Sequence, residues 1–68
     1  MIWFFQREGK RLLYEIRRSD EGDGYELVVT YPDGRVRTER FEDSSALLRR
    51  SIEVQRELIE EGWAPPLD

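Results

Sequence analysis

The fold is decided by residues 24–35, which read GYELVVTYPDGR. Large apolar side chains recur at every second position from Tyr25 to Tyr31, and a period of two is typical of a half-buried β-strand. Pro32 and Gly34 then predict a tight turn. The φ angle of proline suits the first central position, and glycine can take the left-handed conformation that closes the turn with a bulge. The stretch therefore predicts a strand that enters an antiparallel hairpin.

Similar patterns lie on both sides of this stretch. Turn signals at residues 8–9 and 20–24 separate segments that are rich in β-branched and aromatic residues. Residues 12–17 alternate between apolar and polar, whereas residues 35–41 are mostly polar on both faces, as expected of an exposed edge strand. We predict a four-stranded antiparallel β-meander.

The orientation of the first strand depends on the length of the turn at residues 8–9. A two-residue turn places Trp3 and Phe5 on the core face of the sheet and Ile2 and Phe4 on the opposite face. A three-residue loop would reverse this assignment.

The chain after Asp43 has the period of an amphipathic helix rather than of a strand. Asp43 or Ser44 can cap its first turn, and Gly62 suits the left-handed position after its last turn. Trp63 is expected to contact Leu58 there as the apolar part of a Schellman motif. One broad stripe of this helix, expected to pack on one face of the sheet, contains Leu47, Leu48, Ser51, Ile52, Val54, Gln55, Leu58 and Ile59.

Together these elements predict a small α+β fold, with a single ββββα domain over residues 1–63 and a short extended tail over residues 64–68. A domain of 68 residues has a small core and usually gains stability from disulfides, a metal or oligomerisation. The chain has no cysteine and no histidine, which excludes disulfides and disfavours a zinc site. Self-association is the remaining route.

The charge of the chain is unevenly distributed. The net charge is −4, which disfavours indiscriminate binding to nucleic acid or to an anionic membrane. The predicted strands and tight turns nevertheless carry eight basic and five acidic side chains, a balance of +3. No apolar run is long enough to span a membrane, and the first five residues are too short for a signal peptide, so we expect a cytoplasmic protein without membrane partners.

No catalytic, cofactor or metal site is predicted. The acidic loop at residues 20–24 does not fit an EF-hand, because the required glutamate position falls on Tyr31 or Gly34. The serines have no histidine as a base, and the paired glutamates are predicted on the polar helix face. We therefore expect a protein that is not an enzyme.

The main functional prediction is an interaction surface. With the helix on one face of the sheet, Ile2, Phe4, Leu13 and Val28 would lie on the other, and contiguous exposed apolar side chains usually mark a binding surface. The hypothesis is a non-catalytic interaction module that homodimerises through this sheet face or through an edge strand.

The alternative is a single-stranded nucleic-acid-binding protein that uses Arg11, Arg17 and Arg37 with neighbouring aromatic rings. The competing interpretation, which the alternation favours, makes the following rings part of the core: Trp3, Phe5, Tyr14, Tyr25 and Tyr31.

A resemblance covers most of the chain. Residues 24–35, followed by Glu39-Arg40-Phe41 and by a helix ending in Glu61-Gly62-Trp63, resemble short uncharacterised bacterial proteins of ββββα type. At the level of topology only, the chain is similar to PUR repeats and PC4-like coactivators, a resemblance that implies homodimers that bind single-stranded nucleic acid. None of the motifs of those two groups is present. A third possibility, a designed chain without a biological role, is disfavoured by the irregular loops and by Pro65-Pro66.

Overall fold

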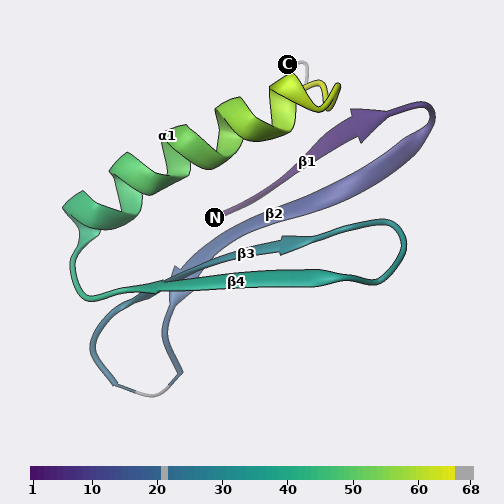
Figure 1. Cartoon of the computed structure of the whole chain (residues 1–68). Helices are drawn as coiled ribbons and strands as arrows, with labels where there is room; N and C mark the ends of the chain where they lie inside the picture. Colours follow the sequence, from purple (N-terminus) through teal and green to yellow (C-terminus); the bar gives the residue numbers. More distant parts are fainter. Residues whose placement is uncertain (21, 66–68) are drawn as a thin grey trace.

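Four antiparallel strands form one sheet in the order β1-β2-β3-β4, and one helix follows them (Figure 1). The structure is a computed structural model, which describes residues 1–20 and 22–65. The elements are β1 (Ile2–Arg7), β2 (Lys10–Arg18), β3 (Tyr25–Thr30), β4 (Val36–Phe41) and α1 (Ser44–Glu60). The predicted α+β fold, a β-meander with a C-terminal helix on one face, is confirmed. Glu21 of the acidic loop and residues 66–68 of the predicted tail lie outside the described residues.

A two-residue turn connects β1 and β2. Glu8 and Gly9 both have positive φ angles, of 52° and 77°, as a type I′ turn requires. The resulting register places Trp3 opposite Tyr14, with Phe5 completely buried in the core. Of the two predicted orientations of the first strand, the one with Trp3 and Phe5 on the core face is correct.

The hairpin between β3 and β4 closes as residues 24–35 predict. The N–H of Tyr31 donates to the carbonyl of Arg35 at 2.9 Å, and the N–H of Gly34 donates to the carbonyl of Tyr31 at 2.9 Å. Gly34 has a φ of 94°, the left-handed conformation expected after the turn. This closure fixes the register of β4 against β3.

Both ends of α1 are capped by local interactions. Of the two predicted N-caps the structure uses Asp43, whose Oδ1 accepts a hydrogen bond from the N–H of Ala46 at 2.8 Å. At the other end, Gly62 has a φ of 97°, and the N–H of Trp63 donates to the carbonyl of Leu58 at 3.0 Å. The predicted Schellman motif is confirmed, and Trp63 and Leu58 are both buried in the same core cluster.

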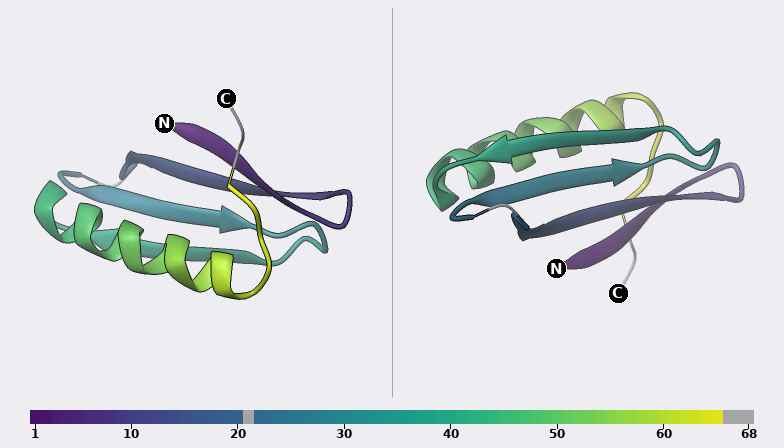
Figure 2. Two further views of the ribbon diagram at one scale, coloured as in Figure 1. Left: turned by 90° about the horizontal axis from the view of Figure 1, so that it is seen from above. Right: turned by 90° about the horizontal axis from the view of Figure 1, so that it is seen from below.

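The helix lies over β3 and β4 (Figure 2). The chain that follows the helix crosses β1 and β2 at one end of the sheet. The residues of α1 that are buried are Leu47, Ser51, Val54 and Leu58. The prediction that Leu48, Ile52 and Ile59 also pack on the sheet is wrong, because these side chains are 61%, 56% and 51% exposed. They lie on the flank of the helix that points away from β4, where no further element meets them in the described part of the chain.

The segment after the helix returns to the sheet edge. The N–H of Ala64 donates to the carbonyl of Gln6 at 2.7 Å, and the N–H of Gln6 donates to the carbonyl of Ala64 at 2.9 Å. This antiparallel bridge, which the sequence did not predict, attaches the start of the tail to the outer edge of β1. The first described residue of the tail is therefore paired with the sheet.

Candidate functional site: the open face of the sheet

The face of the sheet opposite α1 is not covered by any described element, and we call it the open face. Its side chains come from alternate positions of each strand, because successive residues of a strand point to opposite sides. The registers align them in rows across the four strands. The open face consists of Ile2, Phe4, Gln6, Arg11, Leu13, Glu15, Arg17, Glu26, Val28, Thr30, Val36, Thr38 and Arg40.

Apolar side chains are concentrated in one row of the open face. Phe4 lies opposite Leu13 across β1 and β2, and Thr30 lies opposite Val36 across β3 and β4. Phe4 and Val36 are 42% and 61% exposed, and Ile2 in the next row is 57% exposed. These three side chains hold most of the apolar surface that the sheet offers to a partner.

The other two residues of the predicted interface are less accessible. Leu13 lies on the open face but is half-buried, because it lies between neighbours on two adjacent strands. Val28 is only 6% exposed, since Glu15 and Thr38 flank it on the strands at either side. The structure thus groups the four predicted residues on one face, while Val36 is an apolar member that the sequence did not point to.

A buried carboxylate organises the charged end of the open face. Glu26 is 5% exposed and accepts hydrogen bonds from Arg17 Nε at 3.0 Å and from Arg40 Nε at 3.1 Å. The bond to Glu26 raises the pKa of the Arg17 guanidinium above its usual value. Because the carboxylate is held between two guanidinium groups, this end of the sheet is a fixed, partly neutralised cluster.

The three arginines of the nucleic-acid hypothesis do not share a face. Arg11 and Arg17 lie on the open face, and the guanidinium of Arg11 lies 5.4 Å from the ring centroid of Phe4. Arg37 pairs with Val29 across the β3–β4 hairpin and therefore lies on the helix side. There its Nη2 lies 3.1 Å from a carboxylate oxygen of Glu39.

The arginine on the open face of β4 is Arg40, which the sequence pattern did not assign to a site. The turn at residues 32–34 could have predicted this position of Arg40. The length of that turn sets the register of β4 and therefore determines which of its side chains lie on the open face.

Most aromatic rings lie on the helix side of the sheet. Phe5 and Tyr14 are completely buried, and Trp3, Tyr25 and Tyr31 are partly buried against the same core. The prediction that these five rings belong to the core is confirmed. Phe4 is the aromatic side chain that remains on the open face.

Comparisons with protein-family models, with curated proteins and with solved structures found no match to this chain. Within residues 1–20 and 22–65, no group of three or more acidic side chains is arranged to hold a metal ion, and no helix is long and apolar enough to cross a membrane.

Proposed function

We propose that this protein is a small interaction module that forms a homodimer by packing the open faces of two copies against each other. The observation that supports this proposal is the exposure of Ile2, Phe4 and Val36 on one uncovered sheet face. Burial of these side chains against a second copy would remove apolar surface from water, which is the dominant favourable contribution to association.

The charges of the open face favour a second copy as the partner. The face carries Arg11, Arg17 and Arg40 together with Glu15 and Glu26, three positive and two negative charges, so its balance is +1. The whole chain has a net charge of −4. Two copies that associate through this face therefore repel each other less than two copies that associate through the acidic remainder of the surface.

The edges of the sheet are less suited to pairing than its face. Ala64 already occupies the outer backbone groups of Gln6 on β1. The exposed edge of β4 carries Arg37, Glu39 and Arg40, and charged side chains on an edge strand discourage further strand addition. Face-to-face packing is consequently the favoured arrangement.

The dimensions of the face predict a weak, reversible dimer. Four strands spaced about 4.8 Å apart, with six residues of about 3.3 Å each, form a face of roughly 19 by 20 Å. Such an area is about half of the 800 Å² per partner that is typical of specific interfaces, which places it among small, transient contacts. We therefore expect a reversible dimer with a Kd in the micromolar range.

Sedimentation equilibrium from low micromolar to near-millimolar protein concentration tests this proposal. Phe4→Asp should weaken dimerisation by about 30-fold or more, because it places a charge in the apolar row of the open face that the second copy would cover. The matched control is Ile59→Asp, which places the same charge on the exposed helix flank and should leave the dimer intact. Circular dichroism checks that both variants are folded.

A wild-type chain that remains monomeric over the whole concentration range would refute the proposal. A dimer that is lost in Ile59→Asp and retained in Phe4→Asp would assign the interface to the helix flank instead. Titration of mixed-sequence single-stranded DNA and RNA at low salt tests the nucleic-acid alternative, whose binding should weaken steeply as salt is added.

A further inference from the structure

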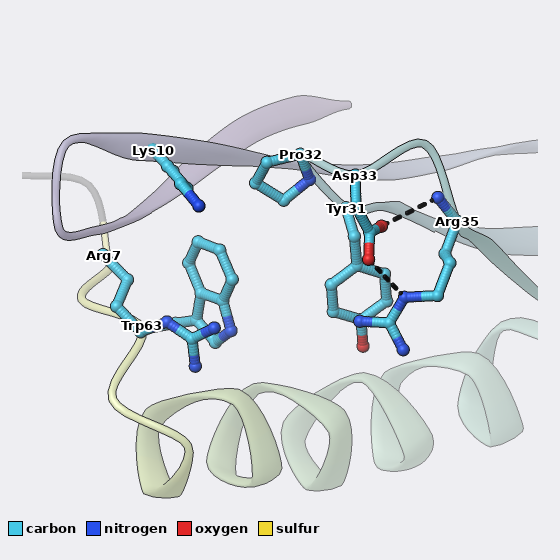
Figure 3. Close-up of a pocket in the computed structure, with 7 residues that line it drawn as sticks. All are labelled: Arg7, Lys10, Tyr31, Pro32, Asp33, Arg35 and Trp63. Carbon is cyan, nitrogen blue, oxygen red and sulfur yellow. Dashed lines mark hydrogen bonds and ion pairs between the residues drawn. The ribbon is translucent and has the colours of Figure 1, made fainter.

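A small hollow lies at the end of the molecule where both tight turns meet the C-terminal end of α1 (Figure 3). Its volume is about 100 Å³. It lies on the helix side of the sheet and shares no residue with the open face. The side chains that line it come from four segments and are Arg7, Lys10, Tyr31, Pro32, Asp33, Arg35 and Trp63.

The hollow is positively charged although the chain is acidic. Three of its lining residues are cationic and one, Asp33, is a carboxylate, which gives a balance of +2 in a chain of net charge −4. Asp33 is already bound, because its Oδ2 lies 2.8 Å from Arg35 Nε and its Oδ1 accepts from the Arg35 N–H at 3.0 Å. The hydrogen bond from that N–H is the main cause that lowers the pKa of Asp33, so this carboxylate stays ionised.

Arg7 and Lys10 supply the charge that is not neutralised. Neither side chain forms an ion pair with any carboxylate in the described part of the chain. The two residues face each other across the first turn, as the register of β1 and β2 requires, and Figure 3 shows Lys10 extending toward Trp63. Two cationic side chains that line one hollow without a counter-charge favour the binding of an anion there.

The aromatic rings hold the two arginines in position. The guanidinium carbon of Arg7 lies 4.3 Å from the centroid of the Trp63 ring, and that of Arg35 lies 4.6 Å from the centroid of the Tyr31 ring. The rings of Tyr31 and Trp63 meet edge to face at 6.5 Å. Arg7 Nη1 also donates to the carbonyl of Glu61 at 2.8 Å. Donors fixed in this way lose little conformational entropy when a ligand binds.

We propose that this hollow binds a phosphate group, with Arg7 and Lys10 as its direct ligands and Arg35 at its border. Guanidinium and ammonium groups are the usual side-chain partners of phosphate. A hollow of about 100 Å³ is smaller than the pockets of roughly 300–1,000 Å³ that enclose whole small molecules, so it suits one anionic group. That group is either free phosphate or the phosphate of a monoester whose remainder stays in solvent.

Titration of the ¹⁵N-labelled protein with inorganic phosphate, followed by NMR at constant ionic strength, tests this proposal. Saturable shifts are expected at the amides of Arg7 and Lys10 and at the indole N–H of Trp63. Lys10 is the only lysine of the chain, so ¹³C-methylation of lysine gives one side-chain signal that reports on the hollow directly. A parallel titration with glycerol phosphate distinguishes the two sources, because tighter binding of the monoester would show that contacts extend beyond the phosphate.

Lys10→Gln is the variant of choice, since Arg7→Gln would also remove the hydrogen bond to Glu61. It should weaken phosphate binding by about tenfold or more, the usual effect of losing one charge-assisted contact. Lys10→Arg should retain binding. The matched control is Arg56→Gln, which removes one positive charge from the exposed surface of α1 and should leave the affinity unchanged.

Three results would overturn the proposal. The first is the absence of a saturable response to phosphate beyond that to chloride at equal ionic strength. The second is an equal response to acetate, which would show that the hollow does not select phosphate. The third is equal weakening in Lys10→Gln and Arg56→Gln, which would indicate diffuse electrostatic attraction rather than a site.

Discussion

The buried side chain of Tyr14 connects the sheet to the helix. Its side chain is completely buried, and its hydroxyl lies 2.7 Å from Ser51 Oγ and 3.2 Å from the Ser51 carbonyl oxygen. Gln55 Nε2 donates to the same Ser51 Oγ at 3.1 Å. Ser51 thus lies in the apolar stripe of α1 because the phenol requires a polar partner there. Burial raises the pKa of Tyr14 above its ordinary value of 10.0.

Replacement of Tyr14 by phenylalanine should lower the free energy of unfolding by about 1 kcal/mol at neutral pH, because one buried hydrogen bond is lost. Above about pH 10 the unfolded chain releases the phenolic proton while the native protein still holds it, so the wild type loses stability as the pH rises. The variant lacks this group, and its disadvantage should shrink in the alkaline range. Urea unfolding at neutral and alkaline pH measures both effects, and a constant difference between the two proteins would contradict the assignment.

The residues that end α1 also contribute to the core and to the hollow. Gly62 takes the left-handed conformation with a φ of 97°, which allows the chain to reverse and places Trp63 in the core at 3% exposure. A Cβ atom on Gly62 would lie 3.3 Å from Cδ of Arg7, the residue that stacks on Trp63. The helix cap, the core tryptophan and the cationic hollow are therefore one connected structure.

Gly62→Ala should lower the free energy of unfolding by about 1–2 kcal/mol, the cost of a left-handed conformation for a residue with a Cβ atom. Gly34→Ala provides the matched control, because Gly34 has a similar φ of 94° but a Cβ atom there would meet no other atom within 4 Å. Both variants should lose stability, whereas a shift of the Trp63 indole NMR signal is expected in Gly62→Ala alone. Equal shifts in the two variants would show that Arg7 and Gly62 are not in tight contact.

The whole molecule has a small core and an incompletely covered sheet. One helix covers β3 and β4, while Phe4 and Val36 stay exposed on the open face and Leu48, Ile52 and Ile59 stay exposed on the helix flank. On the other flank of α1, Arg50 Nε lies 2.8 Å from Glu39 Oε1, so an ion pair also attaches the helix to β4. A domain of this kind has reason to gain stability by association.

The thermal unfolding midpoint of the wild type should consequently rise with protein concentration, because dimerisation stabilises only the folded chain. Scanning calorimetry over a hundredfold range of concentration, about two decades around the expected Kd, measures this effect. The midpoint of Phe4→Asp should be independent of concentration over the same range. A wild-type midpoint that does not change would contradict self-association through the open face.

The sequence alone determined those features that depend on neighbouring residues. The turn at Pro32 and Gly34, the alternation along β3, the two caps of α1 and the core location of the aromatic rings were all predicted, because turn geometry, side-chain period and capping are local chemistry. The possible interface residues Ile2 and Phe4 followed from the same local argument, once the length of the first turn was chosen.

Which surfaces remain exposed depends on contacts between distant segments, which the sequence pattern does not reveal. The period of α1 could not show that the helix lies over β3 and β4 and so leaves Ile59 uncovered, nor that Ala64 returns to pair with Gln6. The hollow is likewise assembled by residues as far apart in sequence as Arg7 and Trp63. The physical reason is that periodicity fixes which side of an element is apolar, whereas the position of an element on the sheet is determined by packing and pairing between distant segments.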